Sequence, residues 1–572
     1  MRFVIATVLL ATSALSVLLG FVLKGPLDAN AGHRIEFKVD SAYSYLVIPH
    51  DTLTKFDGDI SIQATGTKKI FYADARERDI QDWIGTSNFV RLNVNPTTYK
   101  PDISPVTAGG IDTSPTGSDL WRSQLNVQNN LLTEVSMYDD TAVLLASDGL
   151  HRAPTTVTVI WQSANLINWP LLLIYGGAVL LVLALIMNYI AFRHIRKLRG
   201  PRRRIPKAPK GPKYRRRVRP DVPRKGRRSS RRRMMVAPVA LISLSLLAGC
   251  SSAAPAQDAA DATKYEAVNV VVTDNQLKRI VGEVASTVNL ADKTRDEKAL
   301  ITRVSGTALE IRKVQYLLQV KSKKIPKLPE VIANPVTVAL PMQLPEASQP
   351  WQPRTLMVVT KSDSTNRAPQ LMVLQQATPR ENYKLWYLID LLPTAKFPKV
   401  AAQDTGALSV GLDNAYLASN LKSLPFKYGD TINKGLESKF APEFDLASDK
   451  FYAALSESQT QQTADLKKAN ATIRFQHSLG DPNIIGMLTL ESGGLVAISM
   501  DDTSLIRPKV RGVAVSVTQL DHKILLDAPG SASGLKIVYG NMLLFYVPVS
   551  GSTEQIRLVG ASQGILSVKA LN

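Results

Sequence analysis

Few residues in this chain stand at spacings that support catalysis. Its six histidines are dispersed, and no two of them have the spacing of metal ligands. The doublets Asp139-Asp140 and Asp501-Asp502 are more typical of turns and surfaces than of catalytic carboxylate pairs. The stretch Gly560-Ala-Ser-Gln-Gly564 matches the G-x-S-x-G pattern of a hydrolase nucleophile, which requires an Asp and a His later in the chain. The eight residues that follow contain neither, so we expect a turn between two strands and no nucleophile at Ser562.

The single cysteine, Cys250, is the other chemically distinctive residue. It ends the stretch Leu247-Ala-Gly-Cys250, which follows an arginine cluster and a short apolar run and precedes two serines. This arrangement resembles the lipobox of bacterial lipoproteins, which implies that the Cys250 thiol carries lipid and that the bond before it is cut. The alternative is that Cys250 ends an uncut third membrane span. Either interpretation leaves residues 251–572 outside the cytoplasm.

Positive charge is concentrated in residues 193–233. This segment holds 21 Lys and Arg and one acid, Asp221, in a protein whose net charge is +21. Its Pro and Gly content and its lack of apolar periodicity predict a disordered loop. A cationic loop between apolar segments is expected in the cytoplasm, where it contacts anionic lipids. The arginines expected to make these contacts are Arg202, Arg203, Arg204, Arg215, Arg216, Arg217, Arg231, Arg232 and Arg233.

Three apolar segments set the expected topology. Residues 1–23 are long enough to span a bilayer core of about 30 Å, and we expect an uncleaved transmembrane anchor rather than a signal peptide. Residues 169–192 are uncharged, with Trp169 and Tyr189 near the two ends as interfacial anchors. Residues 234–250 suit a lipoprotein-type signal or a short third transmembrane helix. With the basic loop inside the cell, residues 24–168 and 251–572 are extracytoplasmic and the protein is located at the cell membrane.

Residues 24–168 alternate between apolar and polar side chains. The pattern predicts strands at Arg34–Val39, Asp59–Ala64 and Thr155–Trp161. A short helix is expected over Arg76–Ile84, because Ile80, Trp83 and Ile84 fall on one helical face. These elements predict a β-rich extracytoplasmic domain.

After a small, polar linker at 251–268, an α+β pattern begins. Thr273 and Gln276 form a capping-box pattern that starts a helix, and another helix is expected over Arg295–Leu318. The remaining helices are expected at Thr431–Phe440 and Ser448–Ala471, and the strands at Val336–Leu340, Thr355–Thr360, Gln370–Gln375, Tyr383–Leu391, Thr472–His477, Gly486–Leu490, Leu495–Met500, Val510–Thr518, Leu535–Tyr539, Met542–Val547, Gln555–Val559 and Ile565–Val568. We expect two units, 269–400 and 401–572, each with helices packed across a curved antiparallel sheet.

Several stretches resemble an uncharacterised family of actinobacterial membrane proteins, with two extracytoplasmic domains around a basic cytoplasmic loop. They are Tyr45–Pro49, Phe56–Ile60, Asp79–Gly85, Asp119–Trp121, Leu144–Gly149, Tyr539–Pro548 and Gly560–Gly564. This family has no assigned activity, so the resemblance implies location and architecture only. The C-terminal helices and curved sheet are also distantly similar to the cystatin-like roll of nuclear transport factor 2 relatives, which is a likeness of fold alone.

Together these patterns predict a multi-domain membrane protein with an N-terminal β-rich extracytoplasmic domain, transmembrane helices and a C-terminal α+β region. We expect a membrane-anchored cell-envelope protein that binds or scaffolds a wall or envelope partner, with no enzymatic activity, metal or cofactor. One alternative is a small-ligand-binding or enzymatic roll-type domain in residues 263–572, which a deep polar pocket would favour. Another is polyanion binding by the basic loop. Nucleic acid is not an expected partner, since Tyr214 is the loop's only aromatic residue and cannot form a stacking platform.

Overall fold

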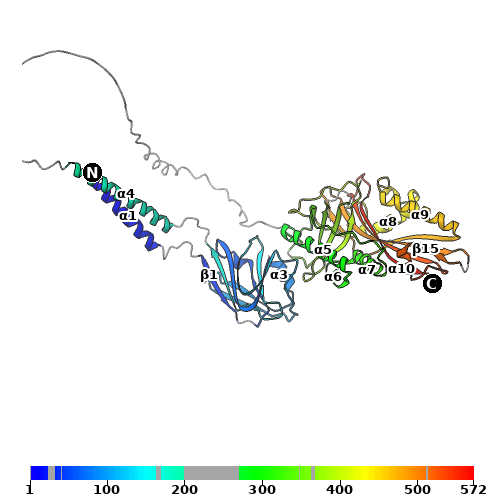
Figure 1. Cartoon of the computed structure of the whole chain (residues 1–572), viewed down its shortest axis with the longest axis horizontal. Helices are drawn as coiled ribbons and strands as arrows, with labels where there is room; N and C mark the ends of the chain where they lie inside the picture. Colours follow the sequence, from blue (N-terminus) through cyan, green and yellow to red (C-terminus); the bar gives the residue numbers. More distant parts are fainter. Residues whose placement is uncertain are drawn as a thin grey trace, which may run out of the picture. The chain divides into compact units, whose positions relative to one another are not determined.

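The computed structural model describes residues 2–23, 32–39, 42–162, 169–198, 269–346, 348–362, 367–393, 395–510 and 513–571. The chain divides into two compact units (Figure 1). One unit, Met1–Ala31 with Asn165–Lys264, contains two long helices. The other, Gly32–Ala164 with Tyr265–Asn572, contains what we call the β-rich module (residues 32–162) and the α+β region (residues 269–571).

The two long helices, α1 (Arg2–Leu23) and α4 (Trp169–Leu198), lie side by side as an antiparallel hairpin (Figure 1). Ser13 Oγ donates a hydrogen bond to the carbonyl of Gly177 at 2.8 Å, and Ser16 Oγ donates to that of Leu173 at 2.9 Å. The buried positions recur every seventh residue and are all small: Ala6, Ser13 and Gly20 in α1, and Gly177, Ala184 and Ala191 in α4. A Cβ at Gly177 would lie 2.6 Å from Cγ2 of Val17, so the close approach of the helices requires glycine there.

Both helices are long and apolar enough to cross a membrane, over Val4–Val22 and Leu171–His194. The prediction that residues 193–233 are disordered throughout is wrong at its start, because α4 continues to Leu198. Arg193 lies over the ring of Tyr189 and Arg196 over that of Phe192, each four residues back along the helix. Cationic side chains are also favourable at a helix C-terminus, so this basic sequence extends the helix.

The β-rich module is built on one eight-stranded sheet. Its strand order is β1-β8-β3-β7-β2-β4-β5, with β6 also paired to β3, and all pairs are antiparallel except β2 with β4. The strands are β1 (His33–Lys38), β2 (Tyr45–Ile48), β3 (Asp59–Arg76), β4 (Phe89–Val94), β5 (Pro101–Val106), β6 (Ser123–Glu134), β7 (Thr141–Ala146) and β8 (Thr156–Gln162). The short helix α2 (His50–Leu53) follows β2.

Both faces of this sheet are buried along the second half of β3. Ile70 and Tyr72 belong to one apolar core, and Phe71 and Ala73 belong to another on the opposite face, because successive side chains of a strand alternate. The second core is covered by α3 (Glu77–Ile84), which contributes the apolar residues that the sequence pattern predicted. The predicted helix is therefore confirmed, with Arg76 as its extended N-cap residue.

The α+β region contains two larger antiparallel sheets, of strand order β12-β11-β10-β9 and β13-β15-β18-β19, with β14 paired to β15, and a small two-stranded antiparallel sheet of β16 and β17. The helices are α5 (Asp274–Thr294), α6 (Glu297–Arg303), α7 (Gly306–Lys321), α8 (Leu424–Lys434), α9 (Lys450–Lys468) and α10 (Leu520–Leu526), with single 3-10 turns at η1 (Leu421–Ser423), η2 (Gly435–Glu437) and η3 (Ala441–Glu443). The strands are β9 (Val336–Pro341), β10 (Arg354–Thr360), β11 (Gln370–Gln376), β12 (Lys384–Asp390), β13 (Ala471–Leu479), β14 (Ile485–Leu488), β15 (Gly494–Pro508), β16 (Val515–Ser516), β17 (Gly530–Ser531), β18 (Leu535–Val547) and β19 (Arg557–Ala570).

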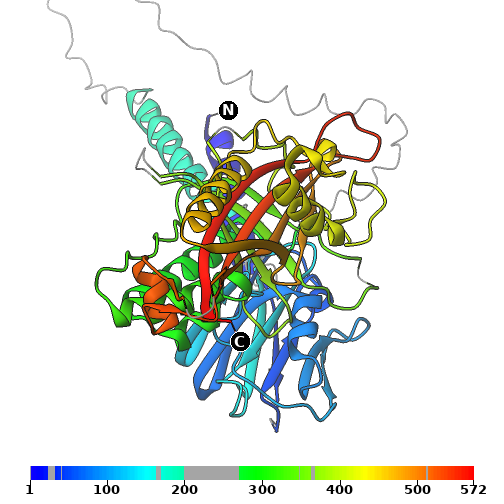
Figure 2. The same cartoon turned by 90° about the vertical axis from the view of Figure 1, so that its right-hand side faces the viewer.

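The long strands β18 and β19 curve through this region (Figure 2), and α8 and α9 pack on the same sheet, mainly against its edge strand β13. Tyr428 of α8 packs on Phe545 of β18 with ring centroids 4.9 Å apart. The largest apolar core takes side chains from both sheets, and the sheets meet where Leu391 bridges to Gly560. The two sheets therefore share one interior.

Several elements differ from the sequence prediction, and in three of them a predicted helix or strand is broken, shifted or shortened. The helix expected over Arg295–Leu318 is broken between α6 and α7, because Val304 and Ser305 are extended and the Ser305 amide donates to Leu385. The helix expected over Thr431–Phe440 begins and ends earlier, since Gly435, at φ 59°, terminates α8. The strand expected over Val510–Thr518 is reduced to β16.

The expected turn at Gly560–Gly564 is instead the interior of β19, where Ser562 pairs with Met542 of β18. The glycines allow other elements to approach the strand. A Cβ at Gly560 would lie 2.9 Å from the carbonyl oxygen of Asp390, and one at Gly564 would lie 2.4 Å from Cγ2 of Ile311. Close packing, rather than a change of chain direction, explains glycine at these positions.

Candidate functional site

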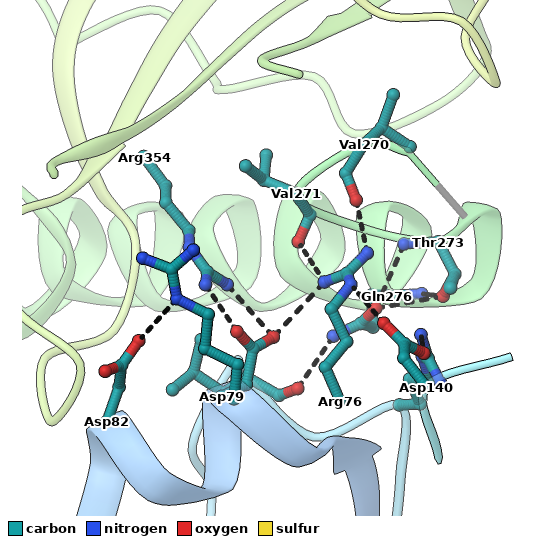
Figure 3. A network of polar contacts seen from close by, with 12 residues as sticks. Arg76, Asp79, Asp82, Asp140, Val270, Val271, Thr273, Gln276 and Arg354 are labelled. Carbon is teal, nitrogen blue, oxygen red and sulfur yellow. Dashed lines mark hydrogen bonds and ion pairs between the residues drawn. The ribbon is translucent and has the colours of Figure 1, made fainter. Parts of the chain in front are cut away.

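Buried charged residues join the β-rich module to the α+β region (Figure 3). We call these contacts the junction. Asp79, on the apolar face of α3, accepts hydrogen bonds from both terminal nitrogens of Arg354, one of them at 3.1 Å. It also accepts from Arg76 Nη1 at 3.2 Å. All three side chains are buried, so this carboxylate is held by two guanidiniums with little access to water.

The electrostatics favour ionised Asp79. Burial raises the pKa of its carboxyl, but the charges of Arg354 and Arg76 outweigh burial and hold the pKa at about 2. Burial likewise lowers the pKa of Arg354, but the charge of Asp79 reverses the effect and raises it. The pKa of Arg76 stays lowered, because burial there exceeds the attraction of Asp79. Arg354 is therefore the stronger partner of this carboxylate.

Arg76 also crosses the junction. Its guanidinium donates to the carbonyls of Val270 and Val271, the latter at 3.1 Å, and its Nε lies 3.4 Å from Asp140 (Figure 3). The Val271 amide in turn donates to the carbonyl of Met342, which holds this segment in place. One arginine thus links the start of α3 to the segment that leads into α5.

Asp119 is the second buried acid of the junction. Its carboxylate accepts two hydrogen bonds from Arg303, the last residue of α6, and one from the Tyr383 amide at 2.8 Å. Its own amide donates to Asn382 Oδ1 at 3.0 Å. Arg303 also pairs with Glu283 of α5. The backbone and side chain of Asp119 are thus both bonded to the α+β region.

The capping box predicted from the sequence also takes part in the junction. Gln276 Oε1 accepts from the Thr273 amide at 3.0 Å, which confirms the cap. The Nε2 of the same side chain donates to the carbonyls of Asp119 and Leu120, at 3.2 and 3.0 Å. One turn later, Arg279 donates to the carbonyl of Trp121 at 2.6 Å. The N-terminus of α5 is therefore held against residues 119–121.

Arg380 holds the other end of α3. It donates to the carbonyls of Trp83 and Ile84, at 2.9 and 2.8 Å, and to Ser87 Oγ at 2.8 Å. The last carbonyls of a helix have no partner within the helix, and its C-terminus attracts cations. Since the guanidinium also lies over the Trp83 ring, 5.4 Å from its centroid, Arg380 caps α3 from the α+β region.

Aromatic side chains accompany these charges. Trp83 and Trp121 of the β-rich module lie 5.4 Å apart between ring centroids, and Trp351 of the α+β region packs against the same core. Arg354 lies 4.2 Å from the Trp351 ring centroid. Paired tryptophans and arginines are the residues that carry most binding energy at protein interfaces. The arrangement is suited to holding two modules together rather than to transforming a substrate.

The catalytic candidates from the sequence stay apart from the junction, except for one acid. Asp140, expected at a surface, pairs with Arg122 at 2.5 Å. Ser562 Oγ accepts from the Asp390 amide at 2.9 Å.

Asp502 was also expected at a surface but is buried, 3.6 Å from His477. Burial raises the pKa of Asp502 to about 6 and lowers that of His477 to about 4, which favours an uncharged pair.

Among the described residues no group of three or more His, Cys, Asp or Glu could hold a metal ion. Cys250 and the predicted lipid-contacting arginines lie outside the described residues: Arg202, Arg203, Arg204, Arg215, Arg216, Arg217, Arg231, Arg232 and Arg233. The segment 234–250 lies outside them as well.

A pocket of about 420 Å³ lies in the α+β region at the end of α5. Its lining residues are Asn289, Asp292, Lys293, Arg295, Gln319, Lys327, Leu328 and Glu330. Asp292 accepts from Tyr316 at 2.6 Å and lies 3.5 Å from Arg312, so its carboxylate is already engaged. The lining mixes both signs of charge with a single aliphatic residue, Leu328, whereas most small-molecule sites are lined mainly by hydrophobic and aromatic side chains.

The junction is not among the sites predicted from the sequence. Asp79 and Asp119 stood in stretches quoted for their family resemblance, without a role, and Arg303, Arg354 and Arg380 were not singled out. One sequence signal was available: Asp79 shares a helical face with Ile80 and Trp83, and a charge on an apolar face implies a buried partner. Nothing in the local sequence identifies Arg354 as that partner.

Comparison with known proteins gives one match. Residues 268–570, more than half of the chain, match a protein family described as Domain of unknown function (DUF8094). No curated protein and no solved structure matches the chain.

We expect Asp119→Asn to destabilise the junction. The neutral amide leaves buried Arg303 without its principal counter-charge, and removing one partner of a buried pair costs about 3–5 kcal/mol. Asp139→Asn is the matched control, because Asp139 is exposed. Thermal unfolding of the full-length protein in detergent, followed by tryptophan fluorescence, measures the effect. Equal midpoints for the two variants would contradict the role assigned to Asp119.

Acid should weaken the junction through Asp79. Because its folded pKa of about 2 lies below the ordinary 3.8, ionised Asp79 stabilises the fold fully above that ordinary value. This contribution, about 2 kcal/mol, is lost as the pH falls toward the folded pKa. Unfolding midpoints measured across this range should therefore fall more steeply for the wild type than for Asp79→Asn. Parallel curves would show that Asp79 is not the titrating group.

Proposed function

The chain belongs to the family described as Domain of unknown function (DUF8094), and from this premise we propose that it is a membrane-anchored cell-envelope protein whose extracytoplasmic modules bind or scaffold envelope components. The family description names no activity, so the proposal rests on the residues of this chain. The hairpin of α1 and α4 is the observation that carries it.

The hairpin has the features of a membrane anchor. Its two helices meet through small residues and leave large aliphatic side chains exposed, among them Leu15 and Leu18 of α1 and Val179 and Leu185 of α4. Such side chains are unfavourable in water and favourable in the hydrocarbon of a bilayer. The packing of α1 against α4 also supports a retained anchor at residues 1–23 rather than a removed signal peptide.

Charge at the helix ends supports one orientation. In the antiparallel hairpin, the start of α1 and the end of α4 lie together, and they carry Arg2, Arg193 and Arg196. The basic segment 193–233 continues from this end, while the opposite ends lead into the β-rich module. By the positive-inside rule, the basic segment is cytoplasmic, against anionic membrane lipids, and residues 24–168 are extracytoplasmic.

The junction supports a further crossing of the membrane. Because Arg303 and Arg354 contact Asp119 and Asp79, the α+β region lies on the same side of the membrane as the β-rich module. A chain with a cytoplasmic basic segment must then cross again between Leu198 and Asn269. The apolar run in residues 234–250 has the composition for this, as a third transmembrane helix or as a lipoprotein-type signal ending at Cys250. Residues 251–572 are then extracytoplasmic.

Within the α+β region we assign two helix-and-sheet units, 269–400 and 401–572. The four-stranded sheet lies wholly in the first and the five-stranded sheet in the second, which supports this division. Their proposed partner is a wall component or another envelope protein.

Small-ligand binding by the roll-type region is the second candidate. The pocket beside Lys293, Arg295 and Lys327 favours it, because these three cations could hold an anionic group. Polyanion binding by the basic segment is a third candidate, supported by its charge alone.

The topology can be tested by thiol labelling. In a Cys250→Ala background, we expect an impermeant reagent to label Thr107→Cys and Ser458→Cys on intact cells and to leave Ser229→Cys unlabelled. Thr107 and Ser458 are exposed on the β-rich module and the α+β region, respectively. Labelling of all three positions after cell lysis is the control. Labelling of Ser229→Cys alone on intact cells would overturn the orientation.

Processing at Cys250 is tested separately. If it is a lipoprotein-type signal, a C-terminally tagged protein should yield a membrane-bound fragment that begins at Cys250. Cys250→Ala or an inhibitor of lipoprotein signal peptidase should leave the chain at full length. An immunoblot that shows one full-length band in every case would instead favour the third transmembrane helix.

A further inference from the structure

We propose that the junction is a self-sufficient protein–protein interface, which holds the α+β region to the β-rich module without the chain that joins them. The partner that this surface of the β-rich module fits is then an α+β region of this type on a separate polypeptide. The biological setting rests on the proposed function, since processing at Cys250 would produce such a two-chain protein.

The contacts of the junction come from within the two modules. Asp79 and Asp119 are held by Arg354 and Arg303, and the ends of α3 and α5 are held by Arg380 and Gln276. Every partner in these contacts lies within residues 42–162 or 269–383. None of these contacts involves the long connection from Ser163 to Val268. For these contacts, the role of the connection is to raise the local concentration of one module near the other.

Each module also has its own apolar core. The core behind β1, β3 and β8 contains side chains of the β-rich module alone, and the three cores of the α+β region contain its own side chains alone. Among the described residues of the α+β region, Trp351 is the one apolar residue that packs against a core of the other module. Such separation is typical of two domains that dock rather than of one domain that is cut.

The chemistry of the surface is that of a specific interface. Six arginines cross it: Arg76, Arg78, Arg279, Arg303, Arg354 and Arg380. Two acids at its centre are fully enclosed, and the rings of Trp83 and Trp121 lie beside them. A wrong partner would leave Asp119 without Arg303 and Asp79 with Arg76 as its remaining cation, which is unfavourable for buried carboxylates. Recognition is therefore built into the residues themselves and does not require covalent linkage.

The sequence between the modules agrees with this inference. The run from the arginine cluster to Cys250 has the order of a signal that opens a lipoprotein, although it lies in the middle of the chain. If the bond before Cys250 is cut, the α+β region becomes a separate lipid-anchored chain. The junction would then keep it on the β-rich module.

The test uses the full chain with a specific protease site inserted after Pro255. The purified protein is cut in detergent and passed through a gel-filtration column at micromolar concentration. The cut lies after Cys250, so no membrane segment can retain the C-terminal fragment. We expect the two fragments of the wild type and of Asp139→Asn to elute together, as one copy of each.

Two variants test the residues named. Cut Asp119→Asn should release the C-terminal fragment, while the uncut variant elutes as a single species. Since Asp119→Asn could also perturb the β-rich module itself, Arg380→Gln is the second variant, because Arg380 is exposed and belongs to no apolar core. The loss of its four hydrogen bonds to the β-rich module, to Trp83, Ile84, Ser87 and Ile111, should weaken association of the cut fragments roughly tenfold or more.

Separation of the wild-type fragments under the same conditions would overturn the inference, as would unchanged association in both variants. Absence of processing at Cys250 in cells would leave this assay unaffected, because the engineered cut does not depend on it. The inference and the proposed function can therefore fail independently.

Discussion

A carboxylate that is removed from water must be surrounded by hydrogen-bond donors or cations. The fully buried Asp79 and Asp119 impose this requirement on the unit that contains the β-rich module and the α+β region. Asp119 takes its counter-charge, Arg303, from the α+β region, and Asp79, which pairs with Arg76 in its own module, takes its second guanidinium from Arg354 of that region. A buried ion pair adds little net stability compared with an apolar replacement, but breaking one is costly. These ion pairs therefore contribute mainly to specificity, because they make one relative placement of the two modules much lower in free energy than any other.

Helix α3 is the element through which this requirement reaches the rest of the fold. Its apolar residues cover the second face of the β-rich sheet, and its single buried acid faces the α+β region. Arg76 at its start and Arg380 at its end bond across the junction. The same short helix thus closes one core and presents the interface. Because it both covers a core and forms the interface, this short helix is hydrogen-bonded to the α+β region at both of its ends.

The junction also constrains the proposed membrane topology. A basic segment kept in the cytoplasm and an α+β region bonded to the β-rich module are compatible only if the chain returns across the membrane between them. The hairpin of α1 and α4 meets a different requirement, since its small residues allow two backbones to approach where apolar burial gives no driving force within lipid. In the proposed topology, anchoring depends on the packing of small residues in one unit, and assembly of the two modules depends on enclosed charge in the other.

Local patterns in the sequence determined the membrane-length helices, the helix at Arg76–Ile84, the capping box at Thr273 and most strands, because periodicity and caps depend on neighbouring residues. Only the tertiary structure decided what those elements bury. Arg303 and Asp119 are 184 residues apart, and Arg354 and Asp79 are 275 apart. A periodic pattern reports that a side chain is enclosed but not which distant group encloses it. For the same reason Gly560 and Gly564 suggested a turn, whereas the close approach of β12 and α7 explains them.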